Sequence, residues 1–331
     1  MVETYINSPE IFFVNTLKER EQMGKYFDYN IHDLIKVRTN FLVDDFLPST
    51  FLVTGMSKPD IELYLKNSKV DTSGLIPLGI RLFYDENTFF HKCRFFLDTH
   101  LKIEDVDETT VIEFNRLYKL FRKPLYYFRA VLQMKLLDKG FSLIHSACVA
   151  KNGKGLMFSA SSDTGKTTTA LHFVIDSGYN LLGDDIVITD GKNILSFPLP
   201  VRKTTSKPFE TIPLLRKLKK EKTISLPLEE EVTPEKIFFL VNGKKNEVNK
   251  VDKREIFRKM NLMTESACPL FPFPMGVMLG YYFVRNIDLK KYLERREKIM
   301  SRLINGCETW MAVAKESSMF YKLVKEAEKE N

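Results

Sequence analysis

"SASSDTGKTT", residues 159–168, is the stretch on which the interpretation of this 331-residue chain depends, because it nearly matches a phosphate-binding loop. The usual loop reads glycine, four residues, glycine, lysine and then serine or threonine. Gly165, Lys166 and Thr167 supply the strict end of that pattern. Ala160 replaces the first glycine, and the acidic Asp163 stands where a small residue is common. We therefore asked whether the surrounding sequence favours a working loop.

The neighbouring sequence predicts a strand before this loop and a helix after it. "SLIHSACVA" and "GLMFS" are typical of two strands joined at Asn152-Gly153, because Asn-Gly tolerates the positive φ that tight hairpins require. "KTTTALHFVIDSG" has its apolar residues at helical spacing, and Gly178 is a suitable stop. A strand, loop and helix in this order is the setting that a phosphate loop needs.

Polyphosphate binding requires backbone amides at a helix N-terminus, a lysine and a hydroxyl for the metal. Lys166 is expected to neutralise the β and γ phosphates as a catalytic residue, and Thr167 to coordinate Mg²⁺. Asp163 would repel phosphate unless it points outward or helps to hold a metal, although Asp enters left-handed backbone better than most residues. The residues expected to bind the nucleotide are Ser161, Ser162, Asp163, Thr164, Gly165, Lys166, Thr167 and Thr168.

Two adjacent acids, Asp184 and Asp185, follow "YNLLG" about eighteen residues after the lysine. Phosphoryl transfer to a hydroxyl needs one carboxylate to orient Mg²⁺ and one to accept the hydroxyl proton. An isolated Asp-Asp pair would more simply cap a turn. Its position soon after a phosphate loop favours the catalytic interpretation.

The segment 143–188, "LIHSACVAKNGKGLMFSASSDTGKTTTALHFVIDSGYNLLGDDIVI", resembles the catalytic core of the HPr kinase/phosphorylase-like proteins, which share their fold with phosphoenolpyruvate carboxykinases. The similarity lies in the order of a His-containing strand, a hairpin, a phosphate loop, a helix that ends on glycine and an Asp-Asp pair. The resemblance implies an α/β P-loop kinase domain of that type, with a mixed sheet.

The resemblance also implies individual roles. The Gly-Lys-Thr end of the loop would hold nucleotide phosphates and Mg²⁺, Asp184 would be the base, and Asp185 would be the metal partner. His145 matches a family histidine near the phosphate site and is an expected catalytic residue, although a lone His on an apolar strand is more often an ordinary core residue. Arg202 and Lys203 would approach the transferred phosphate or an acidic substrate, or else face solvent as a basic pair.

One departure from the family concerns the substrate. The glycine-rich segment that marks true HPr kinases is absent downstream of the acids, where "SFPLPVRKTTSKPF" stands at residues 196–209. This departure argues against HPr as the substrate and against phosphorylase activity.

The remaining sequence suggests two regions. Residues 1–140 are expected to form an N-terminal α/β region that helps to select the substrate, and residues 141–331 the catalytic domain. Within the first region, "TTVIEFNRLYKLF" and "PLYYFRAVLQMKLLDKG" are predicted helices, with Pro124 in the first turn of the second and Gly140 after its end. Further strands and helices are expected at "KIFFLV", 253–260, "DLKKYLERREKIMSRLI", "ETWMAVA" and from residue 318 onward.

Bulk properties restrict the partners. The net charge of +7 is modest and spread along the chain, which argues against a dedicated nucleic-acid binder. The four cysteines are widely spaced and show no metal-ligand pattern, as in a reduced, cytoplasmic protein. The longest uncharged stretch, 269–284, is shorter than the roughly 20 residues of a membrane span. We expect no membrane partner, and the resemblance implies that a homo-oligomer is possible.

The sequence therefore predicts an ATP- and Mg²⁺-dependent kinase that transfers the γ-phosphate to a hydroxyl, such as a serine of a protein or peptide. Two alternatives stay open at this point. One is a kinase of a small molecule such as a sugar or nucleoside, and the other is a nucleotide sensor that no longer catalyses, for which Asp163 is the main argument. The identity of the nucleoside triphosphate is equally open.

Overall fold

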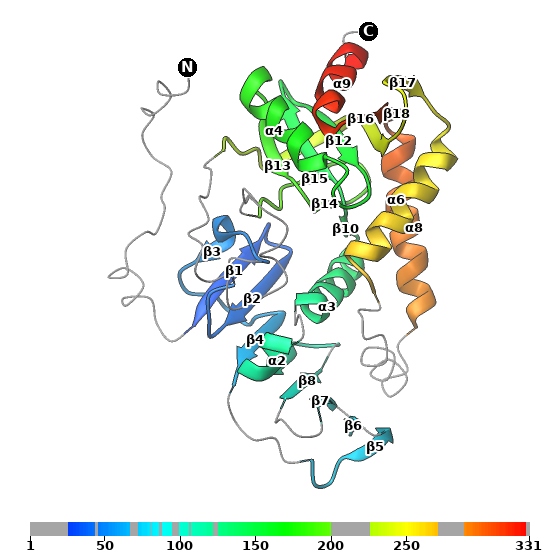
Figure 1. Cartoon of the computed structure of the whole chain (residues 1–331). Helices are drawn as coiled ribbons and strands as arrows, with labels where there is room; N and C mark the ends of the chain where they lie inside the picture. The colour runs from blue at the N-terminus through cyan, green and yellow to red at the C-terminus, as the bar shows by residue number, and fades with distance from the viewer. Residues whose placement is uncertain are drawn as a thin grey trace.

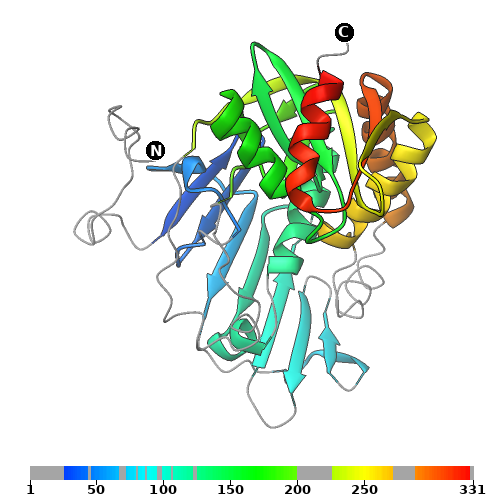
Figure 2. The same cartoon turned by 45° about the horizontal axis from the view of Figure 1, so that its top comes forward.

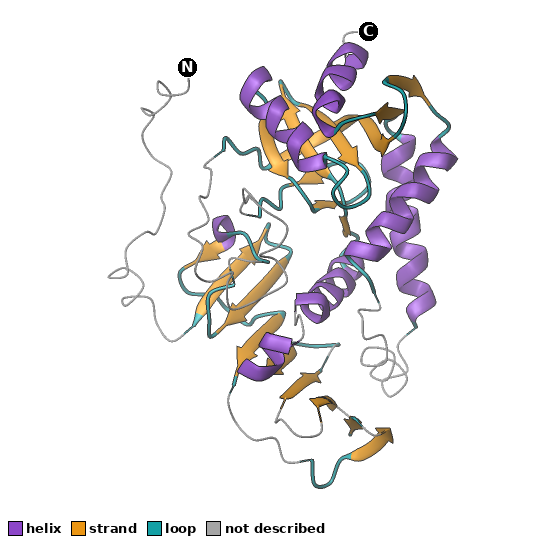
Figure 3. Ribbon diagram, in the orientation of Figure 1, coloured by secondary structure: helices purple, strands orange, loops and turns teal. Residues whose placement is uncertain are grey.

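The chain is an α/β protein with two large mixed sheets, and six α-helices lie in its described part (Figures 1 and 3). The structure is a computed structural model that describes residues 26–43, 46–66, 72–79, 81–85, 88–94, 99–105, 107–121, 125–199, 226–270 and 288–328. None of the helices in these ranges has the length and apolarity that crossing a membrane requires.

The first sheet belongs to the N-terminal region and has the strand order β3-β1-β2-β4-β9-β8-β7-β6-β5. Parallel pairing of β2 with β4 and of β4 with β9 makes this sheet mixed, since its other pairs are antiparallel. The strands are β1 (Phe27–Ile31), β2 (Ile35–Thr39), β3 (Leu52–Val53), β4 (Ile61–Leu65), β5 (Ile76–Gly79), β6 (Leu82–Tyr84), β7 (Thr88–Arg94), β8 (Thr99–Glu104) and β9 (Thr110–Phe114), with a 3₁₀ turn, η1, at Ser49–Phe51.

The helix predicted over 109–121 is half wrong, because its first part is strand β9 and only its second part is helix α2 (Arg116–Phe121). The residues Thr110, Ile112 and Phe114 alternate towards the buried side, and β9 is enclosed by β4 and β8. The apolar spacing of this stretch fits the 3.6-residue period of a helix and the two-residue period of a strand. Residues 110–114 form a strand because they pair with two neighbouring strands. The Asn115 side chain then accepts a hydrogen bond from the Tyr118 amide and begins α2.

The second predicted helix is confirmed as α3 (Leu125–Asp138), which ends before Gly140 at φ 82°. Pro124 lies outside the described residues, as do Arg202, Lys203 and all but the first two residues of the uncharged stretch 269–284.

The second sheet carries the predicted loop and has the order β10-β14-β15-β16-β12-β11-β13, with β18 beside β16 and β17 beside β18. Strand β12 is parallel to β16, and β16 is parallel to β18, whereas the other pairs are antiparallel. Its strands are β10 (Ser142–Ile144), β11 (Ala147–Lys151), β12 (Lys154–Ser159), β13 (Asn180–Gly183), β14 (Val187–Thr189), β15 (Ile194–Leu195), β16 (Glu231–Asn242), β17 (Glu247–Lys250) and β18 (Glu308–Ala314).

Helices cover both faces of this sheet. On β12, Leu156 and Phe158 pack in one hydrophobic cluster with α4 (Lys166–Ser177) and α9 (Phe320–Glu328), whereas Met157 packs in another cluster with α6 (Lys253–Ala267) and α8 (Leu289–Asn305). This alternation follows from the two-residue period of a strand. Figure 2 shows α4 beside α9, and α6 beside α8. The 3₁₀ turn η3 (Ser317–Met319) precedes α9.

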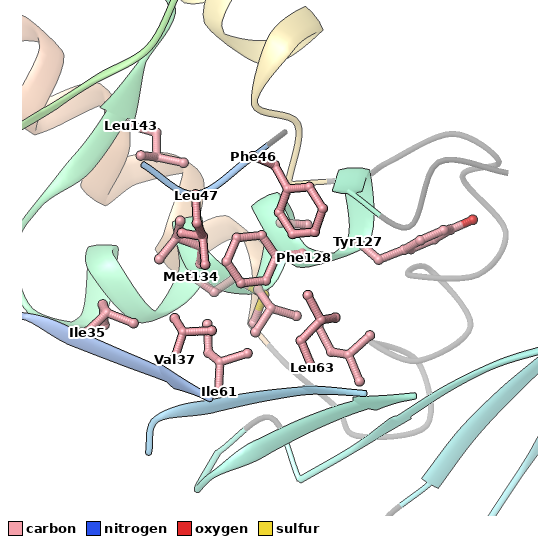
Figure 4. Packing of buried hydrophobic residues seen from close by; sticks show 14 of the residues in the cluster. Ile35, Val37, Phe46, Leu47, Ile61, Leu63, Tyr127, Phe128, Met134 and Leu143 are labelled. Carbon is pink, nitrogen blue, oxygen red and sulfur yellow. The ribbon is translucent and has the colours of Figure 1, made fainter. Parts of the chain in front are cut away.

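A single hydrophobic cluster joins the two sheets. Val37 and Ile61 of the first sheet pack with Phe128 of α3, and Leu143 of β10 belongs to the same cluster (Figure 4). The cluster also contains Ile186, Ile188 and Phe197 from beyond residue 141. The boundary at residue 140 stays a prediction, but the apolar packing crosses it.

The predicted elements of the second region are confirmed in type, with small changes in extent. The Asn152-Gly153 turn has φ angles of 53° and 74° and joins β11 to β12 as a hairpin. "SLIHSACVA" is divided into β10 and β11, which pair with different strands, and the break falls at His145 and Ser146. The division matters because it places His145 between strands, beside the loop.

Candidate functional site

The predicted loop connects the end of β12 to the start of α4, as the sequence indicates. Asp163 adopts the left-handed conformation, with φ 60°, and its side chain is exposed. Gly165 has φ 125°, which a residue with a Cβ rarely adopts. The Ser161 and Thr164 hydroxyls lie 2.8 Å apart in a hydrogen bond across the loop. Asp163 is therefore a solvent-exposed residue of the loop in a backbone conformation that Asp tolerates.

The start of α4 offers unpaired backbone donors. Its N-cap, Gly165, has no side chain to accept from the first turn, and the first bond back to the loop is from the Thr169 amide to the Gly165 carbonyl at 2.9 Å. Across the described residues, the amides of Lys166, Thr167 and Thr168 donate to no acceptor. Such amides and the helix dipole favour an anion at this position.

Lys166 is buried at 6% exposure and has two neutral partners. Its Nζ lies 3.0 Å from His145 Nε2 and donates to the Ala160 carbonyl at 3.2 Å. Among the described residues it forms no ion pair within 4 Å, and an ammonium group has three donors. One N–H is therefore free for a ligand. Burial lowers the pKa of Lys166, and the nearby Asp185 and Asp184 oppose this effect.

His145 links this lysine to the second acid. His145 is 5% exposed, and its Nδ1 lies 3.3 Å from Asp185 Oδ1. Burial, and next to it the charge of Lys166, lower the pKa of His145 to about 4, so the ring is neutral at pH 7. We assign the ring proton to Nδ1, because Nε2 then accepts from the ammonium. Nδ1 makes no hydrogen bond with a described residue, although Asp185 Oδ1 is 3.3 Å away. Lys166 and His145 are thus joined by a hydrogen bond, and Asp185 lies close to the ring without one.

The first acid lies beside the hydroxyl that the sequence assigns to the metal. The Thr167 hydroxyl donates to Asp184 Oδ2 at 3.4 Å. Burial, and next to it the charge of Asp185, raise the pKa of Asp184 to about 6. A carboxylate with a pKa near neutrality is suited to accept a proton in the physiological range. The predicted base and the predicted Mg²⁺ ligand are thus neighbours.

The donor set fits a hard cation. Thr167, Asp184 and Asp185 together offer hydroxyl and carboxylate oxygens, and Mg²⁺ is commonly held by one or two carboxylates with waters and substrate phosphates. No group of three or more His, Cys, Asp or Glu side chains suited to a metal occurs in the described part of the chain. In that part, protein side chains alone therefore do not form a complete metal site. The residues present fit Mg²⁺ that arrives with a nucleotide.

Three further residues adjoin the site without a signal in the sequence. The Thr264 hydroxyl of α6 accepts from the His145 amide at 3.3 Å and fixes the break between β10 and β11. Arg129 of α3 donates to the Ala267 carbonyl at 3.5 Å, and its buried Nε has no hydrogen-bond partner among the described residues. Ser317 lies against the loop at Gly165. Their sequence neighbours carry no motif, so only tertiary contacts reveal them.

A hollow of about 570 Å³ lies at the opposite end of α4. It is lined by Lys151, Lys154, Lys236 and Lys325 together with acidic side chains. Lys154 pairs with Glu235, and the buried Lys236 donates to the Ala327 carbonyl at the end of α9. These partners satisfy the lysines within the fold, so the hollow does not compete with the loop as the candidate site.

Comparison with known proteins assigns no family: no protein-family model matches the chain, and no curated protein matches it. The similarity of residues 143–188 to the HPr kinase/phosphorylase-like proteins remains a resemblance in sequence. The structure brings His145, Lys166, Thr167, Asp184 and Asp185 together at one edge of the sheet. Their roles in catalysis and in metal binding remain predictions.

Proposed function

We propose that this protein is an ATP- and Mg²⁺-dependent kinase that transfers the γ-phosphate to a hydroxyl, with a serine of a protein or peptide as the expected acceptor. The observation that carries the proposal is the buried Lys166. Its described partners are neutral, and it lies at the uncapped start of a helix beside two carboxylates. A buried ammonium group without an ionic partner favours binding of an anion.

Each residue has a defined task in this reaction. The amides that begin α4 and the free N–H of Lys166 bind the β and γ phosphates of ATP. Asp184 accepts the proton of the acceptor hydroxyl, whose oxygen forms a bond to the γ-phosphorus as the bond to the ADP oxygen breaks. Mg²⁺, held by Thr167 and Asp185 when bound, supplies neutralisation of phosphate charge.

His145 positions the lysine. As a neutral acceptor at Nε2, the His145 ring holds the Lys166 ammonium without cancelling its charge, and Asp185 lies 3.3 Å from its Nδ1. A carboxylate in place of this ring would neutralise the lysine and weaken phosphate binding. The exposure of Asp163 is compatible with a catalytic loop, because an exposed carboxylate is screened by solvent.

The test is γ-phosphate transfer from labelled ATP, with peptide libraries and hydroxyl-bearing metabolites as two sets of acceptors. We expect transfer by the wild-type protein to peptides, and its loss in both Lys166→Ala and Asp184→Asn. ATP binding should persist in Asp184→Asn and weaken in Lys166→Ala, as measured by calorimetry. Full turnover in Asp184→Asn would exclude the assigned base, and transfer to metabolites alone would replace the peptide by a small molecule.

A further inference from the structure

The end of strand β18 lies at the same edge of the sheet as the phosphate loop. Strands β12, β16 and β18 are parallel neighbours, so their carboxyl ends meet at one edge. The loop follows β12, and residues 315–318 follow β18. Ligands of α/β sheets bind at the carboxyl ends of parallel strands. Residues 315–318 therefore lie at the same edge of the sheet as the loop, where a ligand of the loop can contact them.

The two segments touch. A Cβ built on Gly165 would lie 2.7 Å from Ser317 Cβ and 3.4 Å from Ser317 Cα, so the glycine lets the two backbones approach each other. Ser317 and Ser318 are both exposed, and neither hydroxyl makes a hydrogen bond to a described residue. The unused hydroxyl group of Ser317 thus belongs to a residue that touches the loop and is open to solvent.

The position of Asp184 suggests how the triphosphate is oriented between Asp184 and the segment after β18. Asp184 follows β13, which is separated from β12 by β11, whereas β18 is separated from β12 by β16 on the opposite side. With the γ-phosphate directed towards Asp184 and Thr167, the α-phosphate and the nucleoside leave the loop in the other direction. That direction leads to the segment after β18.

We propose that residues 315–318 form the wall of the nucleoside subsite and that Ser317 is a specificity-determining contact for the ribose end of a nucleoside triphosphate. This inference rests on the proposed function. It distinguishes a protein that recognises the whole nucleotide from one that recognises polyphosphate alone. Ser317 interacts with the part of the ligand that does not react, so it affects binding of the donor and not the transfer step.

The test compares Mg-ATP with Mg-tripolyphosphate by calorimetry. The wild-type protein should bind ATP more tightly than tripolyphosphate. Ser317→Trp should weaken ATP binding by roughly tenfold or more, because the indole occupies the nucleoside space, and should leave tripolyphosphate binding within about twofold. Ser57→Trp is the matched control, since Ser57 is an exposed serine of the N-terminal region. It should change neither affinity.

The outcomes separate this inference from the proposed function. Equal weakening of both ligands in Ser317→Trp would mean that the substitution only disturbs the loop through Gly165, and unchanged ATP affinity would mean that no nucleoside lies there. Either result overturns the subsite. Failure of the wild-type protein to bind both ligands would overturn the proposed function itself.

A second measurement does not depend on a bulky variant. The wild-type protein is photolysed with 8-azido-ATP, and the labelled tryptic peptide is identified by mass spectrometry. Labelling within residues 316–322, suppressed by excess ATP, supports the subsite. ATP-suppressible labelling confined to other peptides contradicts it.

Discussion

Asp163 shows how a departure from the usual loop pattern is accommodated at a single residue. Its φ of 60° lies in the left-handed region, which Asp and Asn enter more readily than other non-glycine residues. Its side chain is exposed, yet its charge still acts on Lys166. The carboxylate is thus tolerated by the backbone but opposes the binding of phosphate.

Asp163→Asn should therefore improve nucleotide binding. The amide keeps the tolerance for positive φ and removes the negative charge, so we expect ATP affinity to rise by about two- to fivefold at low salt, with a smaller gain at high salt. Calorimetric titration at two salt concentrations measures this. Asp163→Val removes the same charge but strains the backbone, and should lower the melting temperature. Weaker ATP binding in Asp163→Asn would assign the carboxylate to the metal instead.

Asp184 is expected to destabilise the ligand-free protein. Its pKa of about 6 in the fold, against an ordinary value of 3.8, means that the native state holds the proton more tightly than the unfolded state. Wild-type stability therefore falls as pH rises from about 3.8 to about 6, and the full penalty applies above that range. Such a cost in stability is expected if Asp184 has the role proposed for it.

Asp184→Asn should raise the free energy of unfolding at pH 8 by on the order of 2–3 kcal/mol, and by about half as much at pH 5. Urea unfolding in EDTA, with wild type and variant compared at both pH values, measures the difference. Titrating groups that do not interact with Asp184 cancel in this comparison, whereas Asp185 and Lys166, whose charges act on Asp184, do not. A gain that is equal at both pH values would show that the effect comes from packing and not from the charge of Asp184.

At the scale of elements, the junction of β12, the loop and α4 depends on the close approach of η3. Gly165 combines a φ of 125° with contact to Ser317, so an added Cβ meets both backbone strain and a clash. Gly153, in the β11–β12 hairpin, has φ 74° but nothing within 4 Å of an added Cβ. A comparison of substitutions at these two glycines therefore separates the effect of backbone strain from the effect of a steric clash.

Gly165→Ala should lower the free energy of unfolding by more than Gly153→Ala, for which about 1 kcal/mol is expected from backbone strain alone. The clash with Ser317 should add roughly 1–3 kcal/mol and displace the loop, with loss of ATP binding. Thermal unfolding and ATP titration of both variants measure these effects. Equal destabilisation, with ATP binding retained in both, would show that the loop moves away from η3 without consequence.

At the scale of the whole molecule, the two sheets share one hydrophobic cluster. Phe128 and Met134 of α3 pack between strands of the first sheet and Leu143 of β10 (Figure 4). Removal of residues 1–140 would expose Leu143, Ile188 and Phe197, each fully or almost fully buried in the chain. Burying such a side chain contributes about 1.5–3 kcal/mol.

The whole protein should therefore unfold in one cooperative transition, and residues 141–331 alone should not fold stably. Calorimetry of the full chain is expected to give one heat-absorption peak, and the fragment should lack a cooperative melt and bind a hydrophobic dye. Two separate peaks for the full chain, or a cooperative melt of the fragment, would show instead that residues 141–331 are an independent domain.

The sequence predicted most of what depends on local physics. The Asn-Gly hairpin, the helix that ends at Gly178 and the strand "ETWMAVA" are confirmed, because turn residues, caps and apolar periods act within a few residues. Residues 110–114 were predicted as helix and are a strand, because the same apolar spacing allowed both and only β4 and β8 decided between them.

The candidate site likewise has features that the sequence predicts and features that only the tertiary structure provides. Residues 159–168 and the Asp184-Asp185 pair are visible as motifs because a phosphate loop needs its residues in sequence. The contacts of His145 with Lys166 and Asp185, the support from Thr264 and the approach of Ser317 arise only when β11, β12 and β18 are arranged in one sheet and α6 packs on it. Local sequence encodes dihedral preferences, whereas these contacts join residues far apart in the chain, so the order of strands and the packing of helices decide them.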